Sequence, residues 1–168
     1  MTSRQSHNLT RFLAQSTQAI KENEYMDIGE LMHEIMSHLT TGKELSQELD
    51  KKQMEGLIAS DKEKASIKKL IEKALSNPQA QEWFSGKYEL FNERSILYKR
   101  NERHHVFRPD RVMVSTDETI VVDFKFAKPL PTHTQQVKDY ISCLSLMGYR
   151  NIKGYLWYVY KNNIVEVK

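Results

Sequence analysis

The spacing of apolar residues changes near Gly86, and this change constrains the fold more than any other feature of the sequence. Before it, apolar residues recur three and four positions apart, which is the period of an amphipathic helix. The clearest run consists of Leu31, Met32, Ile35, Met36 and Leu39. After it, apolar residues alternate with polar ones, which is typical of strands. The sequence therefore predicts a helical first half followed by a sheet.

Start and stop signals divide the first half into four expected helices. Asp27, with Glu30 three residues later, forms a capping-box pattern, and Gly42 is a stop signal. Further helices are expected over 43–59, 61–75 and 78–84, and the helix over 61–75 is ended by Asn77-Pro78.

The second half predicts three sequential strands, a helix and two further strands. The strands are expected over 88–98, 104–114 and 119–126, with a hairpin turn between the last two. The helix is expected over 133–147, and the final strands over 153–161 and 164–168. This order predicts an α+β or α/β fold, with helices packed on a sheet. We expect a single domain over 1–168, with a helical region over 1–85 and a sheet-and-helix core over 86–168.

Composition restricts the class of protein. The 168 residues are 39% hydrophobic and 28% charged, with a formal net charge of +3, which is typical of a globular protein. One cysteine, Cys143, excludes a disulfide framework, a four-thiolate zinc site and an iron–sulfur cluster within this chain. No apolar run approaches membrane-spanning length, and the N-terminus lacks the apolar region of a signal peptide. We expect a cytoplasmic protein with no membrane partner.

Two aspartates and a lysine mark the strands on either side of the predicted hairpin. Asp110 lies in the first of these strands, and Asp123 lies near the end of the second, so pairing brings the carboxylates together. Lys125 is two residues after Asp123 and points to the same face. Carboxylates bind Mg²⁺, and a neighbouring ammonium suits the hydrolysis of a phosphodiester bond. The alternative is an ion pair at a strand end, which stabilises little if exposed.

Three residues outside this stretch favour a site. Gln136 and Tyr140 are four positions apart on the following helix and share one face, whereas Gln135 lacks that spacing. His33 lies inside the first amphipathic helix, four residues after Gly29. Taken alone, such a histidine is more often a core or surface residue than a metal ligand.

Together these residues match an ordered pattern. It consists of Gly29-x-x-x-His33, Glu93, Pro109-Asp110, Asp123-x-Lys125 and Gln136-x-x-x-Tyr140. The pattern resembles the PD-(D/E)XK nuclease superfamily, which has a restriction-endonuclease-like mixed sheet flanked by helices. Within that superfamily it is most similar to the RecB/AddA-type nuclease domain at the C-terminal end of UvrD/Rep-type helicases. The resemblance runs from about residue 25 to the end of the chain.

The resemblance implies roles for individual residues. A Mg²⁺ or Mn²⁺ ion would be bound by His33, Asp110, Asp123 and the backbone carbonyl of Phe124, with no iron–sulfur cluster. Lys125 would be the catalytic lysine, and Glu93 matches the family's glutamate. Gln136 and Tyr140 would brace the site and contact DNA. The chain departs from the pattern at Phe107, where the family usually has glycine, and at Phe124, where tyrosine is frequent.

Basic residues surround the predicted active-site aspartate, and they suit contacts with phosphate that carry no sequence specificity. The candidates for DNA binding are Lys99, Arg100, Arg103, Arg108, Arg111 and Lys128. A solvated hairpin loop is the alternative interpretation of residues 99–108. His104 and His105 could be metal ligands, but consecutive strand residues point to opposite faces.

These observations predict a metal-dependent deoxyribonuclease, with exonuclease action favoured over endonuclease action. No GxxxxGK[ST] sequence is present, so any helicase partner that acts in DNA recombination and repair must be another domain or chain. Two alternatives stay open. One is a catalytically inactive DNA-binding or protein-docking module that keeps the nuclease fold. The other is a structural α+β domain in which the Asp-x-Lys pattern is a coincidence.

Overall fold

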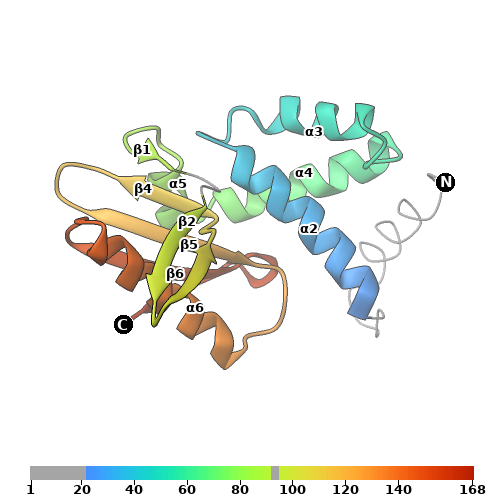
Figure 1. Ribbon diagram of the computed structural model, residues 1–168. Coiled ribbons are helices and arrows are strands. Elements are labelled where there is room, and N and C mark those ends of the chain that lie inside the picture. The colour runs from blue at the N-terminus through green and yellow to red at the C-terminus, as the bar shows by residue number, and fades with distance from the viewer. Residues whose placement is uncertain (1–21, 92–94) are drawn as a thin grey trace. The chain divides into compact units, whose positions relative to one another are not determined.

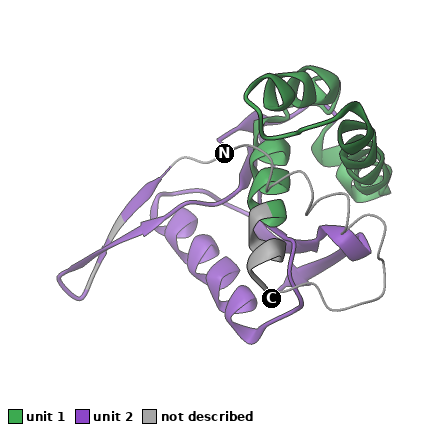
Figure 2. Ribbon diagram, turned by 90° about the vertical axis from the view of Figure 1, so that its right-hand side faces the viewer, with its two compact units in different colours: residues 1–84 green, residues 85–168 purple. Residues whose placement is uncertain are grey.

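The computed structural model describes residues 22–91 and 95–168, without the side chains of 22–27, 98 and 100 (Figure 1). The chain divides into two compact units, Met1–Phe84 and Ser85–Lys168, coloured separately in Figure 2. The boundary lies beside Gly86, where the sequence changes from helical spacing to alternation. None of the helices within the described ranges has the length and apolarity needed to span a bilayer.

The described part of the first unit is helical. Its elements are α2 (Glu22–His38), α3 (Leu45–Met54), α4 (Asp61–Leu75) and α5 (Pro78–Trp83). Apolar residues at helical spacing supply its buried side chains, including Ile35, Met36, Leu39, Leu49, Ile67 and Ile71. The predicted helical first half is therefore confirmed over the described residues.

The predicted start of α4 and of α5 is correct, whereas the predicted start of α2 and the predicted end of α3 are wrong. The Ser60 side chain accepts a hydrogen bond from the backbone N–H of Glu63, and Asn77 caps α5 in the same way. In contrast, α2 already includes Glu22–Asp27, so Asp27 lies inside the helix and does not start it. The helix α3 ends at Met54, before the predicted residue 59, because Gly56 adopts a φ of +78° that a helix cannot continue through.

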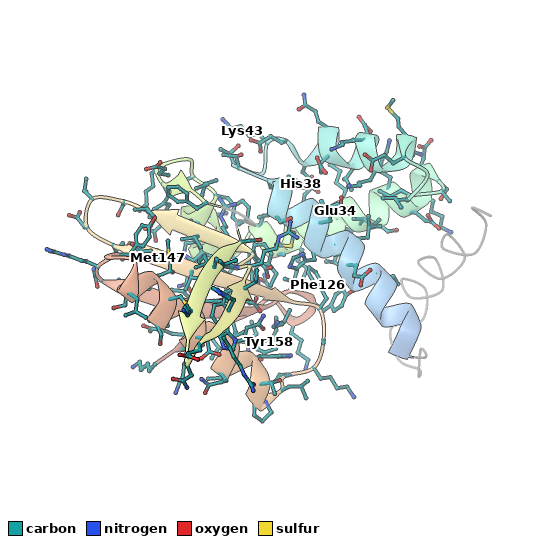
Figure 3. The ribbon with its side chains drawn as sticks, in the orientation of Figure 1. Glu34, His38, Lys43, Phe126, Met147 and Tyr158 are labelled. Carbon is teal, nitrogen blue, oxygen red and sulfur yellow. The ribbon has the colours of Figure 1, made fainter. Side chains whose placement is uncertain are left out.

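A buried lysine joins α2 to α3 in the first unit. The Nζ atom of Lys52 lies 2.5 Å from Glu34 and 3.2 Å from Glu55, and the Lys52 side chain is 2% exposed. Nearby, Nδ1 of His38 lies 2.7 Å from Glu48; Glu34 and His38 are labelled in Figure 3. Burial of a charge is costly unless it is paired, so these carboxylates are part of how the unit packs.

The second unit is built on a five-stranded mixed sheet, with the strand order β1-β4-β5-β6-β7. Its strands are β1 (Glu89–Leu90), β4 (Arg111–Val114), β5 (Thr119–Lys125), β6 (Ile152–Tyr158) and β7 (Asn163–Val167). All neighbours are antiparallel except β5 and β6, which are parallel and joined by the helix α6 (Pro131–Leu146). The mixed α/β class, the hairpin, the helix and the last two strands agree with the sequence.

The first two predicted strands are each interrupted. Residues 96–100 and 103–107 form β2 (Ile96–Arg100) and β3 (Arg103–Phe107), which pair only with each other. Between β3 and β4 stands Pro109, which has no backbone N–H to donate to a sheet. The expected continuous strands over 88–98 and 104–114 are therefore wrong, and β2 and β3 make a separate ribbon.

The strand β5 lies in the middle of the sheet and α6 packs on its face (Figure 1). Every β5 residue from Thr119 to Phe124 is buried, as the apolar run before Asp123 predicted. Val121 of β5 and Val137, Tyr140 and Leu144 of α6 belong to one apolar cluster. This packing fixes α6 against the strand that carries Asp123 and Lys125.

Close approach between α6 and β6 depends on Gly154, which gives a first prediction. A Cβ atom at this position would lie 2.6 Å from side-chain atoms of both Ile141 and Val137. We expect Gly154→Ala to lower the free energy of unfolding by about 1–3 kcal/mol, as is usual for an overpacked core. Urea unfolding measures the change, and Ser145→Ala on the exposed face of α6 is the control. Equal midpoints for the two variants would contradict the packing described.

Candidate active site

Two buried aspartates meet where β4 begins and β5 ends. Arg111 of β4 lies opposite Val122 of β5, so the preceding residue, Asp110, is brought beside Asp123. Asp110 and Asp123 are 5% and 2% exposed. The backbone N–H of Phe124 donates to Oδ2 of Asp110 at 2.6 Å. The β5 backbone therefore holds one carboxylate in place next to the other.

The lysine completes this group. Lys125 is on the same face of β5 as Asp123, and its Nζ lies 2.7 Å from Asp123 Oδ2. No donor among the described residues reaches this buried oxygen at a hydrogen-bonding angle, so the contact is an ion pair. The Lys125 side chain keeps 18% of its surface exposed. The ammonium of Lys125 is therefore partly open to solvent, whereas the neighbouring carboxylate of Asp123 is buried.

The surroundings of Asp123 disfavour its charge. Burial, followed by the negative charge of Asp110, raises the pKa of Asp123 from 3.8 to about 6, although Lys125 opposes the rise. Two carboxylates placed together out of water repel each other unless a proton or a cation lies between them. At neutral pH the site therefore favours binding of a further positive charge.

A second prediction tests whether the charge of Asp123 destabilises the folded protein. The folded protein holds a proton on Asp123 up to a higher pH than the unfolded chain does, so stability decreases as the pH rises from about 4 to about 6. A pKa change of this size corresponds to about 3 kcal/mol. In EDTA, we expect Asp123→Asn to stabilise the protein at pH 7.5 by up to that amount, and to give no gain at pH 4.

Urea unfolding at the two pH values measures the difference. The control is Asp117→Asn, which changes an exposed aspartate in the β4–β5 turn. If the Asp123→Asn substitution raises the free energy of unfolding equally at both pH values, the charge of Asp123 does not destabilise the folded protein.

The helix α6 supplies a hydrogen-bonded support for the lysine. Lys125 Nζ donates to Gln136 Oε1 at 2.8 Å, and Gln136 Nε2 donates to Tyr140 Oη at 2.7 Å. Burial, followed by the charges of Asp123 and Asp110, raises the pKa of Tyr140 well above its usual range. Gln135 instead points to the exposed side, where it binds Asp139. Gln136 is therefore the glutamine that orients Lys125.

One residue near the lysine was missed by the sequence reasoning. His133 is buried at the start of α6, and its Nδ1 lies 3.2 Å from the hydroxyl of Tyr158, which is labelled in Figure 3. Burial, followed by the charge of Lys125, lowers the pKa of His133. His133 precedes Gln136 by three residues and so lies on the same face of the helix. That spacing was the available signal.

The donor atoms suit a hard divalent cation. Mg²⁺ is usually held by one or two carboxylates together with water and a substrate phosphate. Asp110 and Asp123 supply the carboxylates. In an extended strand the carbonyl and N–H of one residue point to the same edge, so the Phe124 carbonyl faces the edge where Asp110 lies. The repulsion at Asp123 gives a physical reason for a cation to bind there.

The two other predicted metal or catalytic residues, His33 and Glu93, are not among the described residues of the second unit. His33 is half-buried on α2, in the first unit, and Glu93 lies outside the described residues. Over residues 22–91 and 95–168 no group of three or more His, Cys, Asp or Glu side chains is arranged to hold a metal ion. The second unit thus contributes a pair of carboxylates, and His33 as a third ligand stays a prediction.

Four of the six residues predicted to contact DNA have exposed side chains, and one is buried. The exposed residues are Lys99, Arg103, Arg108 and Lys128. The side chain of Arg100 lies outside the description. Arg111 is 0% exposed in this structure, so its side chain is not on the surface, and its phosphate contact stays a prediction. His104 and His105 are also exposed, and they pair with different residues across the ribbon.

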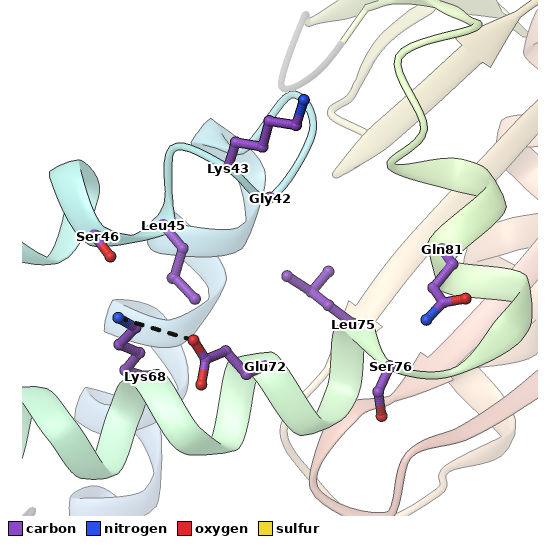
Figure 4. A pocket seen from close by; sticks show the side chains of 9 residues that line it. All are labelled: Gly42, Lys43, Leu45, Ser46, Lys68, Glu72, Leu75, Ser76 and Gln81. Carbon is purple, nitrogen blue, oxygen red and sulfur yellow. Dashed lines mark ion pairs between the residues drawn. The ribbon is translucent and has the colours of Figure 1, made fainter.

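The first unit contains an open hollow of about 430 Å³ (Figure 4). Lys43, Lys68, Glu72 and Gln81 are among its lining residues, and Lys68 and Glu72 form an ion pair at 3.9 Å. None of the residues predicted to bind metal or DNA lines it. The hollow offers no pair of buried ionisable groups, so we place the candidate active site at Asp110, Asp123 and Lys125.

The chain matches no protein-family model, and a search among curated proteins finds no similar sequence.

Proposed function

We propose that this chain is a metal-dependent deoxyribonuclease that hydrolyses phosphodiester bonds. The observation that carries the proposal is the convergence of buried Asp110 and Asp123 with Lys125 at one strand end. Carboxylates that repel each other beside a partly exposed ammonium suit a divalent cation and a phosphate better than they suit a structural ion pair. The mixed sheet flanked by a helix is compatible with a restriction-endonuclease-like core.

The chemistry follows from the positions of these side chains. Asp110, Asp123 and the Phe124 carbonyl would hold Mg²⁺ or Mn²⁺, and the resemblance adds His33 as a fourth ligand. When bound, the cation lowers the pKa of a water molecule and offsets charge on the phosphate. Lys125 is placed to stabilise the negative charge that grows on the phosphate. Gln136, fixed by Tyr140, keeps Lys125 directed at that position.

The wider role that we propose rests on the resemblance to RecB/AddA-type nuclease domains. Such a domain acts with a helicase in DNA recombination and repair. Because this sequence has no GxxxxGK[ST] motif, the helicase would be another part of the same protein or a partner chain. The proposed place of action is the cytoplasm.

A digestion assay tests the proposed activity. The 168-residue chain is incubated with linear single-stranded DNA, linear duplex and closed circular DNA, with Mg²⁺, Mn²⁺ or EDTA. We expect cleavage of linear DNA that requires the metal and is lost in Asp123→Ala. Exonuclease action predicts that closed circular DNA survives. If linear DNA stays intact with both metals while it is bound, the inactive DNA-binding module is the better description.

A further inference from the structure

The β2–β3 ribbon is a separate structural element of the second unit. Its five residue pairs run from Ile96 opposite Phe107 to Arg100 opposite Arg103. Asn101 and Glu102 close it with φ angles of 51° and 62°, as in the two-residue turns of tight hairpins. Figure 2 shows this hairpin extending away from the five-stranded sheet of its own unit. The ribbon forms no strand pairing with the five-stranded sheet, so it is not part of that sheet.

The root of the ribbon is anchored beside the candidate active site. Ile96 and Phe107 are half-buried against the apolar cluster that includes Tyr140. The Phe107 ring meets the Tyr140 ring edge-on, with centroids 5.9 Å apart at 82°. Tyr140 is hydrogen-bonded to Gln136, which binds Lys125. Phe107, where the nuclease family usually has glycine, thus fixes the ribbon relative to the lysine.

Beyond its root the ribbon is exposed and basic. Residues 95–108 hold four Lys or Arg residues and one acidic residue, Glu102. Lys99 and Arg103 are exposed, and no carboxylate among the described residues pairs with either of them. Because side chains alternate along a strand, Lys99 and its partner His104 lie on one face of the ribbon and Arg103 lies on the other. Positive charge is therefore offered on both faces.

An apolar pair follows these charges toward the root. Leu97 and Val106 lie opposite each other and are 71% and 61% exposed. They share a face with Lys99, because Leu97 and Lys99 are two residues apart. A cation on the same face as an apolar pair suits a partner that has phosphates close to apolar groups. A DNA groove has this character, because phosphates border it and thymine methyl groups lie among the base edges inside it.

The dimensions favour duplex DNA over a single strand. Strands of five residues are about 15 Å long and about 5 Å apart. The major groove of B-DNA is about 12 Å wide and admits a two-stranded ribbon.

We propose that the β2–β3 ribbon is a duplex-DNA arm, which lies in the major groove and holds a phosphodiester backbone at Asp110, Asp123 and Lys125. The inference rests on the proposed function, because it takes DNA as the substrate of that site. Lys99 and Arg103 contact phosphates, and Leu97 and Val106 contact base edges.

The test measures binding without cleavage. The 168-residue chain carrying Asp123→Asn is titrated in EDTA against a fluorescent 20-base-pair duplex and a 20-nucleotide single strand, at several KCl concentrations. Lys99→Ala/Arg103→Ala is the ribbon variant. Lys138→Ala/Arg150→Ala removes two exposed charges elsewhere in the same unit and is the matched control. Melting temperatures check that all variants fold.

The ribbon variant is expected to bind duplex about 10-fold or more weakly at 100 mM KCl, with the slope of log K against log salt reduced by about 2. The control variant keeps the wild-type slope, and Leu97→Ser/Val106→Ser weakens duplex binding without changing the slope. An unchanged slope in the ribbon variant, or single-strand binding as tight as duplex binding, would overturn the proposal.

Failure of this inference and failure of the nuclease proposal can be told apart. If DNA is never cleaved but duplex binding depends on the ribbon, the arm is supported and the nuclease proposal fails. If DNA is cleaved and the ribbon variant binds and cleaves like the control, the active site is supported and the arm is rejected.

Discussion

Replacing Lys125 with methionine is expected to lower the rate of Mn²⁺-dependent DNA cleavage by about 10²–10³-fold while Mn²⁺ binding persists. Methionine keeps an unbranched chain but removes the ammonium that lies 2.7 Å from Asp123. Loss of one group that stabilises transition-state charge typically costs this factor. Because that ammonium also competes with a divalent cation for Asp123, its removal is not expected to weaken Mn²⁺ binding.

Single-turnover cleavage and Mn²⁺ titration by calorimetry measure the two effects separately. Lys138→Met, an exposed lysine on α6, is the control for removal of a positive charge. A Lys125→Met protein that cleaves at the wild-type rate would exclude a catalytic lysine. A protein that loses Mn²⁺ binding instead would show that Lys125 acts through the fold of the site.

Replacing Asp110 with asparagine is expected to abolish cleavage, with a loss of about 10³-fold or more, and to weaken Mn²⁺ binding. The amide oxygen can still accept the hydrogen bond from the Phe124 N–H, so the local backbone is preserved. The variant removes one of two carboxylate ligands. Burial is the main cause of the raised pKa of Asp123, and the negative charge of Asp110 adds to it, so removal of that charge should lower the pKa.

Three readouts distinguish this prediction from simple unfolding. Cleavage is measured in a single turnover, and Mn²⁺ binding by the rise in melting temperature that it causes. The pH dependence of unfolding in EDTA reports the pKa of Asp123. Asp117→Asn is the control. If Asp110→Asn retains both cleavage and the Mn²⁺-induced rise in melting temperature, the two aspartates do not form one metal site.

The core of the site could be predicted from the sequence because it depends on local rules. An apolar run followed by Asp123 and Lys125 indicates a buried strand that ends at a charged group. A turn sequence between two strands brings Asp110 opposite that group, and the four-residue spacing of Gln136 and Tyr140 places both on one helix face. These rules need no knowledge of distant contacts.

Other features depend on tertiary packing and could not be predicted in the same way. Arg111 follows Asp110 among basic residues, yet its side chain is 0% exposed. The alternation of residues 103–114 continues through Pro109, so it gives no sign that β3 leaves the sheet to pair with β2. The spacing of His133 and Gln136 predicts a shared helix face, but the burial of His133 depends on its contact with Tyr158, which is distant in the sequence.

A crystal structure with Mn²⁺ bound tests the proposed metal site most directly. Data collected at the manganese absorption edge locate the ion independently of the surrounding density. The site described here predicts one ion bound by Asp110, Asp123 and the Phe124 carbonyl, with Lys125 displaced from Asp123, and the resemblance adds His33 as a further expected ligand. A crystal in which saturating Mn²⁺ leaves this position empty, with Lys125 still paired to Asp123, would contradict a metal-dependent nuclease site.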